Sequence, residues 1–143
     1  MTIFKSRKQY TRIAHYIYPM TLHQLILWQS RYALVAIVYN IISALLQKHI
    51  GAGLTSTDPL MGNIVMVIYC LFLESGKRGF EVLYRILMLL AVLGLGYGGV
   101  ITHLINLVSQ PELYLNIWVG MLAVLINLIG LTLNLYGLFG RYR

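Results

Sequence analysis

The chain has 143 residues, of which 59% are hydrophobic and 10% charged, and its formal net charge is +7. Soluble domains usually carry about 25% charged residues, and a mean hydropathy of +0.74 argues against a soluble core built from so short a chain. The net charge could suggest nucleic-acid binding, but the basic residues cluster at the ends of apolar runs, whereas a nucleic-acid-binding domain would carry them on a soluble surface among aromatic and base-contacting polar groups.

Residues 1–20 form a basic segment that precedes the first apolar run. Within it, Tyr10 and Ile13 share one helical face and Arg12 lies on another, which is typical of a helix lying in the membrane interface. Pro19 then interrupts the helical pattern. We predict an interfacial amphipathic helix in this segment, and no cleaved signal peptide, because no A-x-A-like site follows the first apolar run.

Four apolar runs follow and account for the high hydropathy. A bilayer core of about 30 Å needs roughly 20 helical residues. The runs cover about 24–47, 59–75, 82–108 and 114–139. We therefore predict an all-α polytopic membrane protein, in which residues 1–143 form a single integral membrane domain with four transmembrane helices packed as a bundle.

The second run is the shortest. Its most apolar part, from Leu60 to Leu73, would measure only about 21 Å as a helix, so a re-entrant segment stays open as an alternative to full crossing. Asp58 or Thr57 is the expected N-cap, with Pro59 at the first helical position.

Basic residues are distributed unevenly around these runs. With four crossings, all but one of the 11 Lys and Arg residues fall on the side of the two termini, and the exception is Lys48. The positive-inside rule makes that side cytoplasmic. We expect a multi-pass protein of a bacterial inner (plasma) membrane, with both termini in the cytoplasm.

Three of the runs carry small and amide residues at alternating spacings of three and four. Helices in lipid associate through close packing of small residues and through interhelical hydrogen bonds, so we predict that these stripes form the packing seam of the bundle. A GxxxG pair in the third run marks a neighbouring face where a second helix could approach closely. The predicted seam residues are Asn40, Gly94, Gly98, Gly99, Asn106, Asn116, Gly120, Asn127, Gly130, Asn134 and Gly137.

Candidate chemical groups are few. Glu74 is a candidate ion-binding acid, although the basic residues beside it favour an interfacial ion pair. His49 and His103 are expected in the same half of the bundle, where two imidazoles could ligate a haem between helices; hydrogen-bonded histidines are the simpler interpretation. Cys70 is the only cysteine, so neither an intrachain disulfide nor a cysteine metal cluster is expected. The sequence lacks zinc-site spacing and phosphate-binding or nucleophile motifs.

These observations favour a non-enzymatic membrane protein that acts through helix–helix contacts, as an accessory subunit or binding partner of a larger membrane complex. Its expected partners are the lipid bilayer and other membrane subunits or copies of itself, with no nucleic acid, cofactor or metal. Two alternatives stay open. One is a small homo-oligomeric channel or transporter, and the other is a haem- or quinone-associated redox subunit.

Overall fold

Seven helical segments make up the part of the chain that the computed structural model describes, residues 20–142. They are α2 (Leu22–Ile50), α3 (Pro59–Lys77), α4 (Glu81–Gly94), the π-helical segment η1 (Leu95–Ile101), α5 (Thr102–Ser109), the short 3-10 turn η2 (Pro111–Leu113) and α6 (Ile117–Phe139). The interfacial helix predicted within residues 1–20 lies almost wholly outside the described residues.

Four helices are long and apolar enough to cross a membrane, which confirms the all-α prediction and the four apolar spans. They contain 29, 19, 29 and 23 residues, and the third is a continuous helix, Glu81–Ser109, made of α4, η1 and α5. The second, α3, would measure about 28 Å at the α-helical rise. That length suits full crossing better than a re-entrant segment.

The ends of the helices follow from local capping chemistry. Thr21 forms a capping box with Gln24 at the start of α2, and Gly51 ends that helix in the left-handed region, with φ 73°, where a side chain would be strained. Asp58 is the N-cap of α3, since its carboxylate accepts a hydrogen bond from the Met61 amide at 2.9 Å. Pro59 occupies the first helical position, as predicted.

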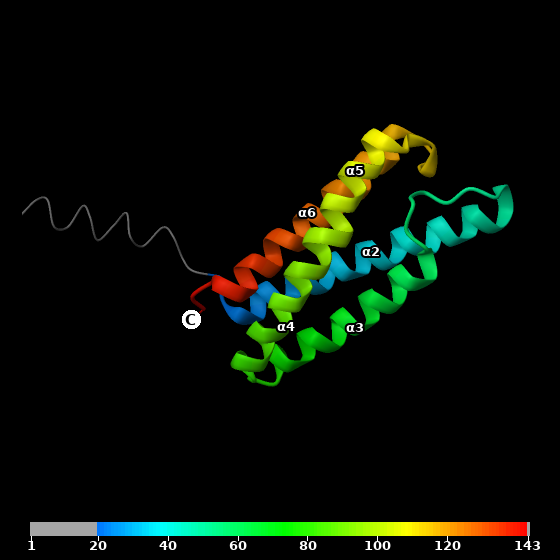
Figure 1. Cartoon of the computed structure of the whole chain (residues 1–143). Helices are drawn as coiled ribbons and strands as arrows, with labels where there is room; N and C mark the ends of the chain where they lie inside the picture. The colour runs from blue at the N-terminus through cyan, green and yellow to red at the C-terminus, as the bar shows by residue number, and fades with distance from the viewer. Residues whose placement is uncertain (1–19, 143) are drawn as a thin grey trace, which may run out of the picture.

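The helices alternate in direction and form a ring of four neighbours. α2 packs against α3 and α6, and α4 packs against the same two helices. The start of α2, the turn between α3 and α4, and the end of α6 lie together at one end of the bundle (Figure 1). We call this the basic end. The opposite, or loop, end carries the connections 51–58 and 110–116.

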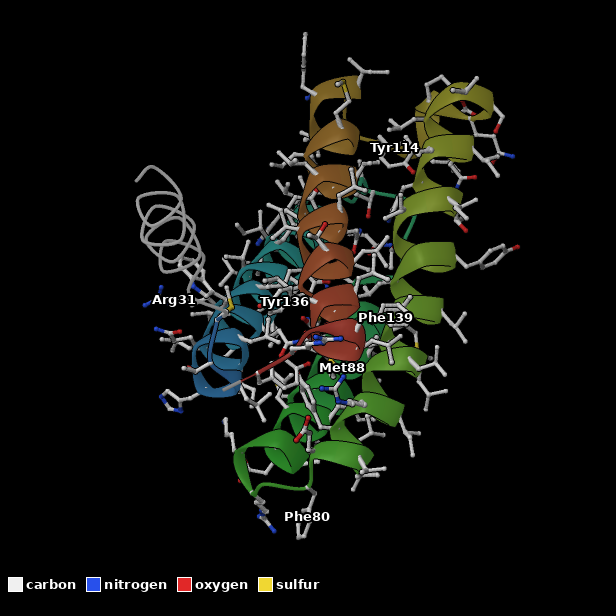
Figure 2. The ribbon with its side chains drawn as sticks, turned by 90° about the vertical axis from the view of Figure 1, so that its left-hand side faces the viewer. Arg31, Phe80, Met88, Tyr114, Tyr136 and Phe139 are labelled. Atoms are coloured by element: carbon white, nitrogen blue, oxygen red, sulfur yellow. The ribbon has the colours of Figure 1, made fainter. Side chains whose placement is uncertain are left out.

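The charged residues of the described part gather at these two ends. Figure 2 shows Phe80 at the turn of the basic end, Tyr114 near the loop end, and side chains projecting outward along the helices between them. The outward-facing positions are mostly large hydrophobic residues. Such an exterior suits the hydrocarbon of a bilayer. Arg31, Lys77, Arg78, Arg85 and Arg141 belong to the basic end, and Lys48 to the loop end.

The core lies along the axis of the bundle, nearer the basic end. Tyr32, Tyr69 and Tyr84 bury their rings there, and the first two meet edge to face with their centroids 5.8 Å apart. Tyr32 packs on Gly130, where a Cβ would overlap its ring. A glycine at this position is what lets α2 and α6 approach closely.

Candidate functional site

A buried polar network joins all four spans in the half of the bundle nearer the basic end. At its centre are the amides of Gln29 on α2 and Asn134 on α6, both completely buried. Gln29 Nε2 donates to Asn134 Oδ1 at 3.0 Å. Tyr69 of α3 donates its hydroxyl to the same oxygen at 2.7 Å, and Tyr84 of α4 donates to Gln29 Oε1 at 2.7 Å.

This network fixes the register of the four helices. Rotation of any helix would separate a buried polar group from its partner, and such a group costs roughly 1–3 kcal/mol when left unsatisfied. Two buried atoms have no hydrogen-bond partner among the described residues: Asn134 Nδ2, which belongs to the network, and the neighbouring Tyr32 hydroxyl. The network therefore uses both amide oxygens between helices and leaves one amide nitrogen unpaired.

A cavity of about 490 Å³ occupies the bundle between this network and the loop end. That volume falls within the range of about 300–1,000 Å³ found for small-molecule sites. Its floor consists of apolar and aromatic side chains, which include Met66, Tyr69 and Leu90, and its upper part is bordered by Thr55 and Thr57 of the loop end. The residues that line it include no Asp, Glu, Lys or Arg.

The glycines of the third span create this space. Gly94 ends α4 and lies near the midpoint of the continuous helix Glu81–Ser109. A Cβ added at Gly94 or Gly98 would meet nothing within 4 Å. Both residues line the cavity, and the backbone between them passes into the π-helical segment η1. Single π-helical turns inside α-helices often occur at functional sites.

Two asparagines line the cavity, and each lies on a glycine of a neighbouring helix. Asn40 of α2 covers Gly62 of α3, where a Cβ would lie 2.6 Å from Asn40 Nδ2. Asn127 of α6 covers Gly99 of η1, where a Cβ would lie 2.8 Å from Asn127 Oδ1. Asn127 Nδ2 donates to the carbonyl of Ala123 in its own helix, at 3.0 Å. Asn127 therefore makes no interhelical bond comparable to that of Asn134.

A second polar cluster closes the cavity at the loop end. His103 is buried, and its Nδ1 lies 2.8 Å from the Tyr114 hydroxyl. Its Nε2 lies 3.2 Å from Thr57 Oγ1. Asn106 Nδ2 donates to Ser56 Oγ at 3.2 Å. The cluster thus ties the loop that precedes α3 to the third span and to the segment that leads into α6.

The two histidines considered as haem ligands have different surroundings. His49 is exposed near the end of α2, whereas both ring nitrogens of His103 have protein partners. A metal bound to His103 would have to displace Thr57 or Tyr114. The described residues contain no group of three or more His, Cys, Asp or Glu side chains that could hold a metal ion.

Glu74, the candidate ion site, lies near the end of α3. Its carboxylate is 3.5 Å from Lys77 Nζ and 3.4 Å from Arg78 Nε, and its side chain is 43% exposed. Exposed pairs of this kind contribute little to stability, about 0–1 kcal/mol. The geometry is that of an ion pair at the membrane edge.

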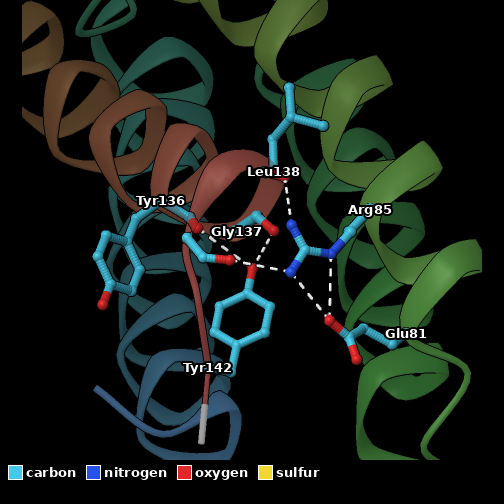
Figure 3. Close-up of polar contacts among 7 residues, drawn as sticks. Glu81, Arg85, Tyr136, Gly137, Leu138 and Tyr142 are labelled. Carbon is cyan, nitrogen blue, oxygen red and sulfur yellow. Dashed lines mark hydrogen bonds and ion pairs between the residues drawn. The ribbon is translucent and has the colours of Figure 1, made fainter. Parts of the chain in front are cut away.

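Arg85 organises the basic end on the other side of the turn (Figure 3). It pairs with Glu81 at 2.9 Å. It also donates to the carbonyls of Leu138 and Gly140, at 2.7 and 2.9 Å, and so caps the end of α6. Its guanidinium lies 4.9 Å from the centre of the Tyr142 ring. Burial raises the pKa of the Tyr142 hydroxyl to about 12, so this group remains a neutral donor to the Gly137 carbonyl.

The predicted seam residues fall into three groups in the structure. Gly120, Gly130, Asn134 and Gly137 are buried between helices, and Asn40, Gly99, Asn106 and Asn127 are half-buried. Gly94 and Gly98 are exposed and border the cavity. Asn116 is exposed and serves as the N-cap of α6, accepting from the Val119 amide at 3.0 Å.

Sequence reasoning missed the tyrosines of the network, Tyr69 and Tyr84, and their neighbour Tyr32. Hydropathy treats Tyr as an interfacial residue, and these three lie within predicted spans. Tyr69 carried a usable signal, because it lies near the middle of the second run and a buried tyrosine hydroxyl usually needs a hydrogen-bond partner.

Comparison of the chain with models of protein families, with curated proteins and with solved structures finds no match.

Proposed function

We propose that this chain is a non-enzymatic, multi-pass membrane protein that acts through contacts inside the bilayer, as an accessory subunit or binding partner of a larger membrane complex. The observation that carries the proposal is the placement of its polar groups. The two completely buried amides, Gln29 and Asn134, and the hydroxyls of Tyr69 and Tyr84 bond to one another between helices. The acidic side chains lie at the helix ends and in the loops.

This placement supports contact rather than chemistry. Proton-coupled carriers generally need an ionisable group inside the membrane whose charge changes during the cycle. Glu74 has two cationic neighbours within 4 Å and is accessible at the basic end. The bundle presents a mostly apolar exterior around a hydrogen-bonded polar network. The same placement, under the positive-inside rule, supports an orientation with the basic end in the cytoplasm.

Purification in a mild detergent, followed by mass spectrometry, tests the proposal. We expect unrelated membrane subunits to accompany the chain in fixed proportion. A single species of several copies would favour the homo-oligomeric channel or transporter, and a Soret band in the visible spectrum would favour the haem-associated redox subunit. Either result, obtained without partner subunits, would contradict the proposal.

Tryptophan substitutions on the outer faces locate the contact. Leu34 on α2, Val67 on α3, Leu93 on α4 and Leu125 on α6 are all exposed, so a tryptophan at each leaves the core untouched and obstructs one face. We expect one variant to lose the partner while the other three keep it. Glu74→Gln removes the candidate ion-binding carboxylate and tests whether its charge is needed. This variant should retain both the partner and the activity of the assembly. Loss of activity with the complex intact would support a carrier instead.

A further inference from the structure

The cavity between the buried network and the loop end raises a question that the contact role does not answer. It lies between four helices of one chain and reaches the middle of the third span. A void of this size inside a packed bundle forfeits dispersion contacts along its whole lining. A filled cavity recovers them.

The cavity opens sideways, between α3 and the third span. Val65 and Ile68 on α3, and Leu90 and Gly98 on the third span, line the cavity and are exposed, so the cavity is open along this side of the bundle. Toward the basic end the two helices pack together, as the contact between α3 and α4 shows, and they diverge toward the loop end (Figure 1). An occupant would therefore enter from the lipid phase.

The lining changes character with depth. Toward the middle of the bundle it is made of Met66, Phe72, Leu90 and similar apolar residues. Toward the loop end it offers hydrogen-bonding groups from Asn40 and Asn127, followed by the threonines and His103. Such a gradient matches a molecule with an apolar chain and a polar head.

The amide groups indicate what that head carries. The hydrogen bonds of the described residues do not involve the Asn40 amide, and Asn127 uses only its Nδ2, which leaves Oδ1 free. Amides exposed in a cavity at membrane depth gain from a partner that can donate and accept, because water is scarce there. The lining holds no cationic or anionic side chain, and burying an unpaired charge is far more costly than burying a neutral polar group. The head is therefore neutral.

We propose that this cavity binds a neutral amphiphile, a molecule with a carbonyl or hydroxyl head and an apolar chain, that enters laterally between α3 and η1. The head lies among Asn40, Asn127 and the threonines of the loop end, and the chain lies against Met66 and Leu90. Quinones and neutral glycerides share this chemistry. The inference goes beyond the contact role and does not depend on it.

The test is thermal unfolding of the full chain in dodecyl maltoside micelles, with three probes at rising concentration. Decylubiquinone and 1,2-dioctanoylglycerol have neutral head groups, a quinone ring and a glycerol. Oleate at pH 9 or above has a charged carboxylate head group. A bound ligand stabilises by mass action, in proportion to ln(1 + [L]/Kd). We expect at least one neutral probe to raise the unfolding midpoint in a saturable way and oleate to leave it unchanged. A response to decylubiquinone alone would indicate a quinone, and a response to dioctanoylglycerol alone would indicate a glyceride.

Gly98→Leu provides the decisive variant. Its new side chain would meet no atom at the Cβ position, since nothing lies within 4 Å there, and because Gly98 lines the cavity a leucine would narrow the cavity and its opening. We expect it to abolish the effect of the neutral probes. Tyr97→Leu is the matched control: Tyr97 is the preceding residue, is exposed and does not line the cavity, so its variant should respond like the wild type. Asn40→Leu should weaken the response at least tenfold in apparent Kd.

Several results would overturn the proposal. These are a response to the neutral probes that survives in Gly98→Leu, an equal response to oleate, or the absence of any saturable response. Recovery of only charged phospholipid with the purified chain would show that the cavity holds a lipid acyl chain. If Gly98→Leu loses a co-purifying protein and no probe stabilises the wild type, the cavity receives a helix of a partner. If Gly98→Leu keeps its partner and loses only the response to the probes, the ligand site and the partner contact are separate.

Discussion

Asn134 is the residue whose substitution tests the buried network most directly. Asn134→Leu keeps a side chain of similar length and removes the oxygen that accepts from Gln29 and from Tyr69. Hydrogen bonds between helices in membranes contribute about 0.6 kcal/mol each on average and up to about 1.7. Two such bonds amount to about 1–3 kcal/mol, and the Tyr69 hydroxyl would also lose its partner inside the bundle.

The matched control for this prediction is Asn127→Leu. It makes the same substitution two turns away on the same helix, but the Asn127 amide bonds only within its own helix and borders the cavity. We expect a smaller loss, below about 0.5 kcal/mol, because this variant gives up no hydrogen bond between helices and leucine, of similar size, keeps the contact with Gly99. Unfolding by sodium dodecyl sulfate in mixed micelles, followed by circular dichroism, measures both variants.

A double-mutant cycle with Gln29→Leu sharpens the test. Replacing both partners of a buried hydrogen bond by apolar groups costs less than the sum of the single changes. We expect a coupling of about 0.5–2 kcal/mol between positions 29 and 134. Equal losses for Asn134→Leu and Asn127→Leu, together with strict additivity in the cycle, would refute the role assigned to the network.

Three further predictions concern topology, packing and the basic end. In a Cys70→Ser background, a cysteine at Ser56 should react with a membrane-impermeant maleimide in intact cells and a cysteine at Arg78 should not; labelling of both from outside would contradict the four-span topology. Gly130→Ala should lower stability by about 1–3 kcal/mol, because its Cβ would overlap the Tyr32 ring. Gly94→Ala has open space around its Cβ and should stabilise the third span by up to about 1 kcal/mol. Unfolding of the two variants in detergent measures the contrast. Arg85→Gln should free the end of α6 by removing the donors to Leu138 and Gly140, seen as faster carboxypeptidase digestion than in Arg78→Gln, whose partner is the exposed Glu74.

The local pattern of the chain was sufficient to predict the four long helices of the described residues. Hydropathy and length identified four apolar runs, and the structure has four helices long enough to span a membrane at those positions. The Asp58–Pro59 start of α3 was predictable because a cap depends on three or four adjacent residues. The pairing of Glu81 with Arg85 was predictable for the same reason, since residues four apart meet on one helix.

Gly120, Ala123, Gly130, Asn134 and Gly137 are buried on α6, and their common helical phase can be read from the sequence alone. The sequence could not rank the members of this stripe. Asn127 and Asn134 are seven residues apart and have the same phase, yet one faces a cavity and the other is completely buried. The difference depends on what the neighbouring helices place at each depth.

The cavity and the network were decided by tertiary structure. Tyr69, Tyr84 and Gln29 come from three separate helices, and only the packing of the bundle brings Gln29 and Tyr69 to Asn134 and brings Tyr84 to Gln29. The opening between α3 and the third span arises because these helices meet near the basic end and diverge beyond it. Neither outcome follows from hydropathy or helical period, since both depend on the axial offset and the separation between helices, which side chains from several parts of the chain determine together.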